Sequence, residues 1–250
     1  MQPDWLASRQ NEALYNSFWK TVPDYVRFNP GARHRRRLLL RALPRTNCVS
    51  LLDVGCGDGL FLRVLRRRRP DIGILAGADL APAQVERNRE TARDVAFHVL
   101  DVQTGSLGET FDVVVCSEVI EHVEDQRSAM LHLSKMVNPG GWLVVTCPTG
   151  KVYETEKHFG HVHHPTVAEL VAHASAAGLR ANSVSNWGWP TYKLMKWATN
   201  VNSEWALKSF ASGPYSLAAK AVSDGLYWVN FLNVSDRARG CQIIAVFKRD

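Results

Sequence analysis

Short apolar runs alternate with amphipathic segments through the middle of the chain. The runs are continuous and rich in valine, leucine and isoleucine, as in strands buried on both faces; they lie at residues 49–54, 72–78, 95–100, 111–116 and 142–147. Segments with helical spacing separate them, at residues 59–68, 82–93 and 124–137. This alternation predicts a parallel, doubly wound α/β sheet with helices on both faces.

The pattern changes on both sides of that core. Apolar residues recur at helical spacing over residues 5–20 and 32–43, which are joined by a link at residues 25–29. Toward the C-terminus a helix (166–177), a strand (179–185) and a long, mostly helical segment precede a last strand at 241–248. The prediction therefore has four parts: an N-terminal helical cap at 1–45, a core at 46–185, a helical insertion at 186–238 and a final core strand at 239–250.

The composition is that of a globular protein, with 46% hydrophobic and 22% charged residues among 250. The five cysteines form no Cys-x-x-Cys pair, which disfavours a zinc knuckle and indicates reduced thiols. We find no secretory signal and no apolar run of about 18 residues, so a cytoplasmic location is expected. The net charge of +6 is concentrated in arginine clusters at residues 33–45 and 63–69. We interpret these clusters as solvated helix faces or as surfaces for phosphate, nucleic acid or an anionic membrane.

A glycine-rich turn follows the first strand of the core. The sequence Asp-Val-Gly-Cys-Gly-Asp-Gly occupies residues 53–59, between a strand and a helix. Glycines there let the backbone approach a ligand and adopt positive φ, and the ligand of such a sheet binds at the carboxyl ends of its strands. Carboxylates also end the second and third strands, at Asp79 and Asp101. The spacing Gly-x-Gly-x-Gly departs from the Gly-x-Gly-x-x-Gly of dinucleotide-binding proteins, which disfavours an NAD site.

These motifs, in this order, resemble the class I S-adenosylmethionine-dependent methyltransferase family over residues 50–148. The resemblance implies S-adenosylmethionine as co-substrate and a Rossmann-like, mostly parallel sheet of seven strands, with the last strand antiparallel and beside the sixth. The residues it assigns are Asp53, Gly55, Cys56 and Gly57 for the methionine part, Asp79 and Leu80 for the ribose, Asp101 and Val102 for the adenine, and Ser117 and Glu118 below the methionine end. In relatives the segment around residues 25–33 caps the cofactor, and Tyr25 and Arg33 are predicted to reach the methionine carboxylate.

Catalytic candidates follow the fourth and fifth strands. On a helix, Glu118, Glu121 and His122 would share one face, and with His161 they form a candidate site for a divalent metal. The segment resembles the Glu-x-x-Glu-His turn of ubiquinone-pathway O-methyltransferases and of small-RNA 3′-terminal 2′-O-methyltransferases, and the latter hold a metal with it. Similar Glu-His residues occur in metal-free members, with capping or cofactor-pocket roles. Four histidines fall within residues 158–164, where the methyl group should point. His161 or His164 is predicted to act as a general base or to position the acceptor, and His122 is a third catalytic candidate.

We therefore expect methyl transfer to an oxygen of a small-molecule, glycan or natural-product acceptor. The alternative is an RNA 2′-O-methyltransferase that uses a divalent metal, which the arginine clusters support and the lack of a recognised RNA-binding module disfavours. A non-catalytic cofactor-binding scaffold is the third class. Tryptophan and lysine interleave over residues 186–197, where the insertion is expected to cover the substrate, to lie on a membrane surface or to form a homodimer face.

Overall fold

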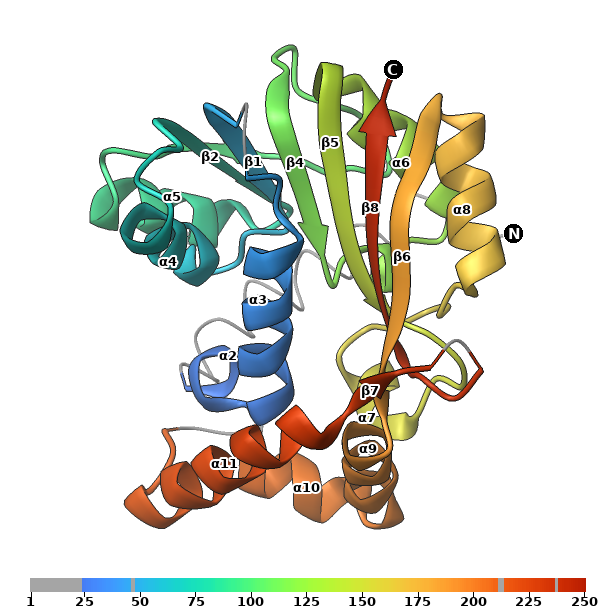
Figure 1. Cartoon of the computed structure of the whole chain (residues 1–250). Helices are drawn as coiled ribbons and strands as arrows, with labels where there is room; N and C mark the ends of the chain where they lie inside the picture. The colour runs from blue at the N-terminus through green and yellow to red at the C-terminus, as the bar shows by residue number, and fades with distance from the viewer. Residues whose placement is uncertain (1–23, 46–47, 211–213, 237) are drawn as a thin grey trace.

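The computed structural model describes residues 24–45, 48–210, 214–236 and 238–250, and its centre is an eight-stranded sheet (Figure 1). The strands are β1 (Ser50–Val54), β2 (Ile74–Asp79), β3 (Ala96–Val99), β4 (Phe111–Ser117), β5 (Val137–Pro148), β6 (Leu179–Trp189), β7 (Val234–Ser235) and β8 (Gln242–Arg249). They lie in the order β3-β2-β1-β4-β5-β8-β6-β7. The helix predicted at residues 5–20 lies outside the described residues.

The pairing of the strands confirms a Rossmann-like, mostly parallel sheet. β1 to β5 pair in parallel, and β8 is antiparallel between β5 and β6. The last strand therefore lies beside the sixth, as expected. The expected count of seven strands is wrong by one because β7, a two-residue strand, pairs with the end of β6. β6 itself continues to Trp189, so the first residues of the insertion are strand and not helix.

Helices cover both faces of the sheet. The helices α3 (Pro30–Ala42), α4 (Leu60–Arg68) and α5 (Pro82–Thr91) pack on one face, and α6 (Gln126–Lys135) and α8 (Val167–Ala176) pack on the other. Successive side chains of β1 point to opposite faces. Leu51 packs in the apolar cluster beneath α3, α4 and α5, and Leu52 packs in the cluster beneath α6 and α8. Both leucines are fully buried, which confirms the doubly covered sheet.

Two predicted boundaries are corrected by local geometry. Residues 25–29 do not form an extended link, because α2 (Tyr25–Phe28) adds one helical turn before α3. Asn29 then caps α3 by accepting a hydrogen bond from the N–H of Ala32. The Asn-Pro-Gly-Gly sequence at 138–141 does not lie outside the strand but inside β5, where the pairing with β4 shifts register around Gly140, whose φ is 75°.

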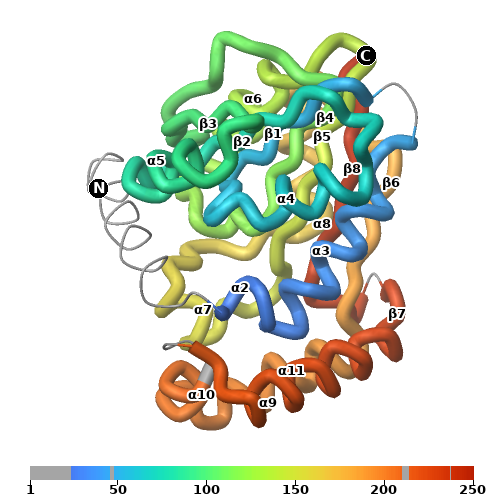
Figure 2. The backbone as a smooth tube through the Cα atoms, turned by 90° about the vertical axis from the view of Figure 1, so that its left-hand side faces the viewer, coloured from blue at the N-terminus to red at the C-terminus, as the bar shows by residue number. Residues whose placement is uncertain are grey.

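A further layer of helices lies beneath the carboxyl ends of β4 and β5, at the bottom of Figures 1 and 2. It contains α7 (Glu154–His158), α9 (Thr191–Val201), α10 (Ser203–Phe210), α11 (Leu217–Val229) and the short 3-10 helix η2 (Asn230–Leu232). Because α11 contacts α2 and α3, the N-terminal segment and the insertion form one cover over this end of the sheet. Within the described residues, no helix is long and apolar enough to cross a membrane.

Candidate functional site

A cavity of about 410 Å³ lies between the sheet and this layer of helices. The glycine-rich turn and the ends of β4 and β5 form one wall, and α2 and α3 form a second. Residues of α7, α9, α10 and α11 close it from the opposite side. The cavity therefore occupies the place where doubly wound sheets bind ligands.

Backbone contacts hold the glycine-rich turn. Gly55 and Gly57 have φ angles of 76° and 51°, in the left-handed region that favours glycine. The N–H groups of Gly55 and Cys56 donate to the carbonyl of Ala78, at 2.8 and 3.0 Å. A Cβ atom on Gly55 would overlap Cγ2 of Val119. The turn thus requires glycine for both its conformation and its packing.

Asp79 connects this turn to the end of β2. Its Oδ2 accepts a hydrogen bond from the N–H of Gly57 at 2.8 Å, and its Oδ1 accepts one from the N–H of Ala81 at 3.0 Å. Each carboxylate oxygen has a second lone pair, so both can still accept a hydrogen bond from a hydroxyl group.

The residues predicted for the cofactor, apart from Arg33, fall into two groups. Asp79, Leu80, Asp101 and Val102 lie outside the cavity lining, at the adjacent ends of β2 and β3. Those that line the cavity are Tyr25, Asp53, Gly55, Cys56, Gly57, Ser117 and Glu118.

Asp53 is a buried carboxyl on the cavity wall. Burial, with a smaller effect of the charges of Asp79 and Asp58, raises its pKa to about 8. The side chain is therefore largely neutral at pH 7, and a cationic ligand beside it would favour its ionised form.

The N-terminal segment presents different arginines from the one that was predicted. The guanidinium of Arg33 forms an ion pair with Asp224 and lies over the ring of Tyr227, outside the cavity lining. The next turn of α3 brings Arg35 and Arg36 to the cavity instead. Helical periodicity explains the difference. At about 100° per residue, the side chain of Arg35 points about 160° away from that of Arg33, and the side chain of Arg36 points about 60° away.

Arg35 and Arg36 differ in their partners. Arg35 pairs with Glu118 at 3.1 Å, and although burial opposes it, this carboxylate raises the pKa of Arg35. Arg36 donates to the carbonyl of Val26 at 3.4 Å, and it forms no ion pair with a carboxylate in the part of the chain that the structure describes. Burial lowers the pKa of Arg36, and the charge of Arg35 adds to this effect.

The predicted helical face of Glu118, Glu121 and His122 is wrong. Glu118 has a φ of 59° and ends β4, and only residues 120–122 form a turn, the 3-10 helix η1 (Ile120–His122). The carboxylate of Glu118 does not join the clustered ligand atoms of the other two and instead accepts hydrogen bonds from Gln242 at 2.6 Å and Thr146 at 3.1 Å.

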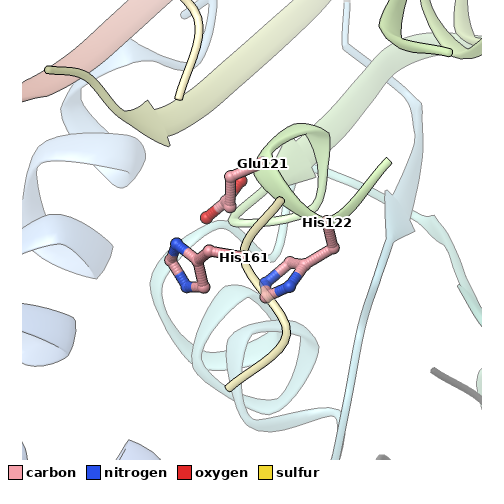
Figure 3. Close-up of side chains that lie close together, drawn as sticks. All are labelled: Glu121, His122 and His161. Atoms are coloured by element: carbon pink, nitrogen blue, oxygen red, sulfur yellow. The ribbon is translucent and has the colours of Figure 1, made fainter. Parts of the chain in front are cut away.

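Glu121, His122 and His161 come together without Glu118 (Figure 3). One ligand atom of each lies within 4.8 Å of the others. Glu121 is completely buried, and neither of its carboxylate oxygens has a hydrogen-bond partner among the described residues. Burial, with the nearby charge of Glu118, raises the pKa of Glu121 well above its usual range. Burial also lowers the pKa of His122 to about 4 and that of His161 to about 2, so both imidazoles are neutral at pH 7.

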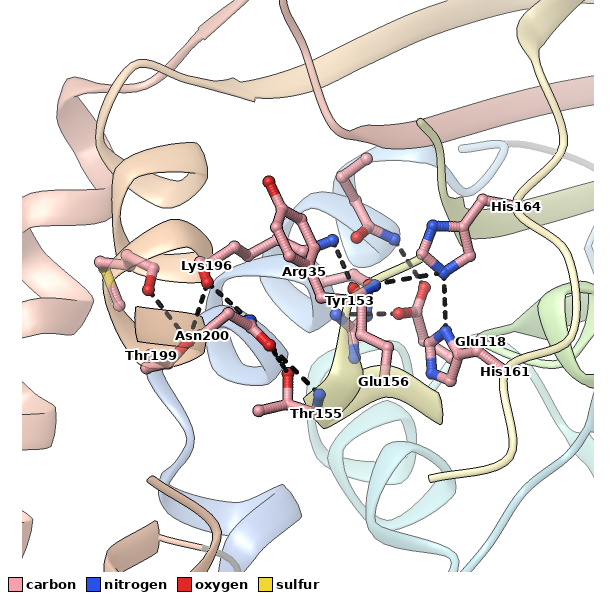
Figure 4. A network of polar contacts seen from close by, with 12 residues as sticks. Arg35, Glu118, Tyr153, Thr155, Glu156, His161, His164, Lys196, Thr199 and Asn200 are labelled. Carbon is pink, nitrogen blue, oxygen red and sulfur yellow. Dashed lines mark hydrogen bonds and ion pairs between the residues drawn. The ribbon is translucent and has the colours of Figure 1, made fainter. Parts of the chain in front are cut away.

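The predicted histidines occupy different depths. His161 lines the cavity, whereas His164 is buried behind it, with 2.8 Å between Nδ1 of His161 and Nε2 of His164 (Figure 4). Burial lowers the pKa of His164 to about 4. Glu156 approaches these histidines, and the three residues form a second group of metal-ligating side chains. The remaining two histidines of the segment, His158 and His163, are exposed.

The insertion contributes its own polar residues to the cavity. Lys196 of α9 forms an ion pair with Glu156 of α7 at 2.5 Å, and both side chains are nearly buried. Oδ1 of Asn200 accepts hydrogen bonds from the N–H of Thr155 at 3.1 Å and from its hydroxyl at 3.0 Å. These contacts join α9 to α7 and so place the insertion against the histidine segment.

A family model described as a methyltransferase domain matches residues 25–184, which include the glycine-rich turn, Asp79 and Glu121. The chain belongs to the class I S-adenosylmethionine-dependent methyltransferase family. This confirms the resemblance that the motifs carry.

Individual relatives are consistent with this assignment. A ubiquinone biosynthesis O-methyltransferase of Azorhizobium caulinodans is 34% identical over 112 residues, which are 42% of this chain and 43% of that protein. An uncharacterized methyltransferase of Mycobacterium bovis is 37% identical over 101 residues, which are 40% of this chain and 50% of that protein. The chain thus spans about half the length of these curated relatives or less.

A solved structure shares the fold over nearly the whole chain. It is the N-methyltransferase NodS from Bradyrhizobium japonicum in complex with S-adenosyl-L-homocysteine, with a TM-score of 0.59 and 20% identity. The match covers 94% of this chain and 98% of that one. At this identity the likeness concerns the fold alone.

Several cavity residues were not predicted as site residues. Arg35 and Arg36 were noticed only as members of a basic cluster, and Lys196 only as part of a tryptophan- and lysine-rich segment. Glu156 and Gln242 carried no signal, because their partners, Lys196 and Glu118, are distant in the sequence.

Proposed function

We propose that this protein transfers a methyl group from S-adenosylmethionine to an oxygen of a small-molecule acceptor. The observation that carries the proposal is the continuous cavity, which extends from the glycine-rich turn to His161 and to the insertion helices. The methionine end of the cofactor and the acceptor would share one enclosed space, and a sulfonium methyl group needs mainly alignment and exclusion of water for in-line attack. The names of the O-methyltransferase relatives support an oxygen acceptor.

In this proposal the cofactor lies across the ends of β1, β2 and β3. Asp79 and the backbone of Leu80 would accept the ribose hydroxyls, and Asp101 and Val102 would flank the adenine. The methionine part would lie on the turn from Asp53 to Gly57, above Ser117. Arg36 replaces Arg33 as the residue proposed to bind the methionine carboxylate, because it lines the cavity and its guanidinium pairs with no carboxylate among the described residues.

The acceptor side of the proposal rests on Glu121, His122 and His161. A buried carboxylate with two unsatisfied oxygens is costly on its own, and two neutral imidazoles beside it complete a donor set suited to a divalent transition metal. A cation held there would supply Lewis acidity, which lowers the pKa of an acceptor hydroxyl. The pKa of about 2 makes His161 a weak base by itself, which favours its role as a ligand over that of general base.

A small molecule is a better acceptor than RNA for this site. Five arginines of the two clusters are already held by carboxylates: Arg33, Arg35, Arg63, Arg66 and Arg69. Their charges are thereby partly neutralised, which weakens the case for a phosphate-binding surface. A steep dependence of RNA binding on salt concentration would reverse this preference.

The test combines a cofactor assay with metal removal. Release of S-adenosylhomocysteine is measured with simple phenols and catechols as acceptors, before and after chelation and after adding back Mg²⁺, Mn²⁺ or Zn²⁺. We expect chelation to abolish turnover, and Glu121→Gln to weaken metal binding in calorimetry, whereas the exposed neighbour Glu124→Gln does not. Full turnover in the presence of chelator would exclude a metal from the proposed mechanism and would leave His161, oriented by His164, as the candidate base. No binding of S-adenosylhomocysteine would leave only the scaffold class.

A further inference from the structure

Exposed apolar side chains are concentrated on the insertion. Large hydrophobic residues that are exposed occur throughout the described chain, but most of them lie within residues 194–234. They include three tryptophans, Trp197, Trp205 and Trp228, which are 58%, 58% and 67% exposed, and Leu217, which is 87% exposed. Scattered exposed apolar residues are ordinary, whereas a contiguous group of this size marks an interaction surface.

The helices of the insertion carry large apolar residues on the side turned away from the cavity. In α9, Met195, Lys196 and Thr199 line the cavity, and Leu194, Trp197 and Val201 lie on the opposite face at spacings of three and four residues. A helix on the surface of a globular protein normally carries polar residues on the face turned away from the core. Here the cavity side holds the lysine and the solvent side holds the leucine and the tryptophan.

The neighbouring helices repeat this arrangement. Leu207 of α10 lines the cavity while Trp205 is exposed. In α11, Ser223 and Leu226 line the cavity, whereas Leu217, Val222 and Trp228 are exposed. Both views of the chain place α9, α10 and α11 together at the end of the molecule away from the sheet (Figures 1 and 2). Their outer sides therefore form one apolar face, which we call the outer face.

Cations lie at the edge of the outer face, and each rests on an aromatic ring. Arg37 is 4.2 Å from the ring centre of Phe231, whereas Arg33, which lies 4.3 Å from the ring centre of Tyr227, is already paired with Asp224 of α11. Lys193 and Arg239 lie over the ring of Trp189. An apolar, tryptophan-rich surface with a rim of lysine and arginine is the pattern of peptides and proteins that lie in the interface of an anionic bilayer.

We propose that the outer face of α9, α10 and α11 docks on the surface of an anionic lipid bilayer. Tryptophan and leucine would enter the headgroup region, and Arg37, Lys193 and Arg239, which form no ion pair among the described residues, would pair with anionic headgroups. The cationic rim favours an anionic surface as the occupant, and a second copy of the chain is an outcome that the test below separates from it. If the proposed function is right, the cavity directly behind these helices could receive an acceptor that is dissolved in the lipid.

The test is vesicle co-sedimentation of the whole chain without cofactor or acceptor, so its result does not depend on the proposed function. Vesicles of phosphatidylcholine alone are compared with vesicles that contain about one third phosphatidylglycerol. We expect binding to the anionic vesicles, weakened at about 0.5 M salt, where the Debye length is short. Absence of binding to the anionic vesicles overturns the proposal.

Matched variants locate the contact. Trp197→Ser combined with Trp228→Ser should weaken vesicle binding at least about tenfold, and Leu194→Ser should weaken it less. Leu131→Ser changes an exposed leucine of α6, on the sheet, and should leave vesicle binding unchanged. Equal binding of the double tryptophan variant and the unaltered chain overturns the proposal. So does a stable dimer in solution that Leu194→Ser dissociates, because a second copy would then cover the outer face.

Discussion

The two sides of the cavity are built by different means. On the cofactor side, the turn from Gly55 to Gly57 is held by backbone N–H groups and by one carboxylate, Asp79, which are within 25 residues of each other. On the acceptor side, the geometry depends on side-chain pairs that join distant segments, such as Lys196 with Glu156 and Gln242 with Glu118. The comparison indicates that the cofactor site is constrained by local conformation, whereas the acceptor site is open to change by single substitutions in the insertion.

The largest effect is expected on the cofactor side. Asp79→Ala should weaken binding of S-adenosylhomocysteine about 100-fold, or ~3 kcal/mol, because hydrogen bonds from both ribose hydroxyls to a carboxylate would be lost. Calorimetry measures the affinity, and thermal unfolding checks that the turn is intact. Asp94→Ala, which removes an exposed carboxylate paired with Arg66, is the control and should bind normally. Unchanged affinity in Asp79→Ala would mean that the cofactor binds elsewhere, and the contrast between a cofactor side and an acceptor side of the cavity would be wrong.

A substitution on the acceptor side should separate folding from cofactor binding. Lys196→Met leaves the carboxylate of Glu156 without its cation in a nearly buried place, so the free energy of unfolding should fall by ~2 kcal/mol. The affinity for S-adenosylhomocysteine should stay within about twofold, since its proposed contacts are local to the turn. Denaturant unfolding and calorimetry measure the two quantities.

The control for Lys196→Met is Lys157→Met, which removes the cation of an exposed ion pair with Glu154 in the same helix as Glu156. It should cost under ~0.5 kcal/mol. Adding Glu156→Gln to Lys196→Met should restore part of the lost stability. A loss of cofactor affinity as large as the loss in Asp79→Ala would show that the two sides of the cavity are not independent.

The smallest effect is a pH dependence of cofactor binding. Burial raises the pKa of Asp53 to about 8 in the free protein, so below that pH the carboxyl is protonated. If the ammonium group of the cofactor lies beside Asp53, the complex holds the carboxylate ionised, and binding releases a proton. The affinity for S-adenosylhomocysteine should therefore rise about tenfold between about pH 6.5 and about pH 8, and then level off. Asp53→Asn should remove the slope, and a slope that persists in this variant would assign the proton to another group.

Much of the fold was accessible from the sequence because its signals are local. Each strand of the core contains a short apolar run, and the predicted bounds of β1 to β4 and β8 lie within two residues of those observed, whereas β5 begins five residues earlier than predicted. The exceptions have causes outside the segment itself, such as the continuation of β6 through Trp187 to Trp189, where β7 and β8 supply the pairing partners. The strands that pair with this part of β6 lie about 50 residues further along the sequence.

The site was only partly accessible for the same reason. Glu121, His122 and His161 were predicted to meet and do meet, but Glu118 was included wrongly, since a helical spacing was assumed where the backbone takes a positive φ. Arg33 was chosen from the correct segment, yet the direction of its side chain depends on how α3 packs against α11. All three arginines, Arg33, Arg35 and Arg36, lie on one predicted helix. The helical spacing alone does not show which side of that helix faces the cavity.

The sequence by itself determined the alternation of strands and helices, the glycine turn, the carboxylates at the strand ends and the family to which the chain belongs, because these depend on residues close together along the chain. Tertiary structure alone decided which side chains enter the cavity, which arginine at the cavity has no carboxylate partner among the described residues and which face of the insertion is turned to solvent. Those properties depend on the burial of charges and on the rotation of helices about their axes, and both are set by contacts between segments that are remote in sequence.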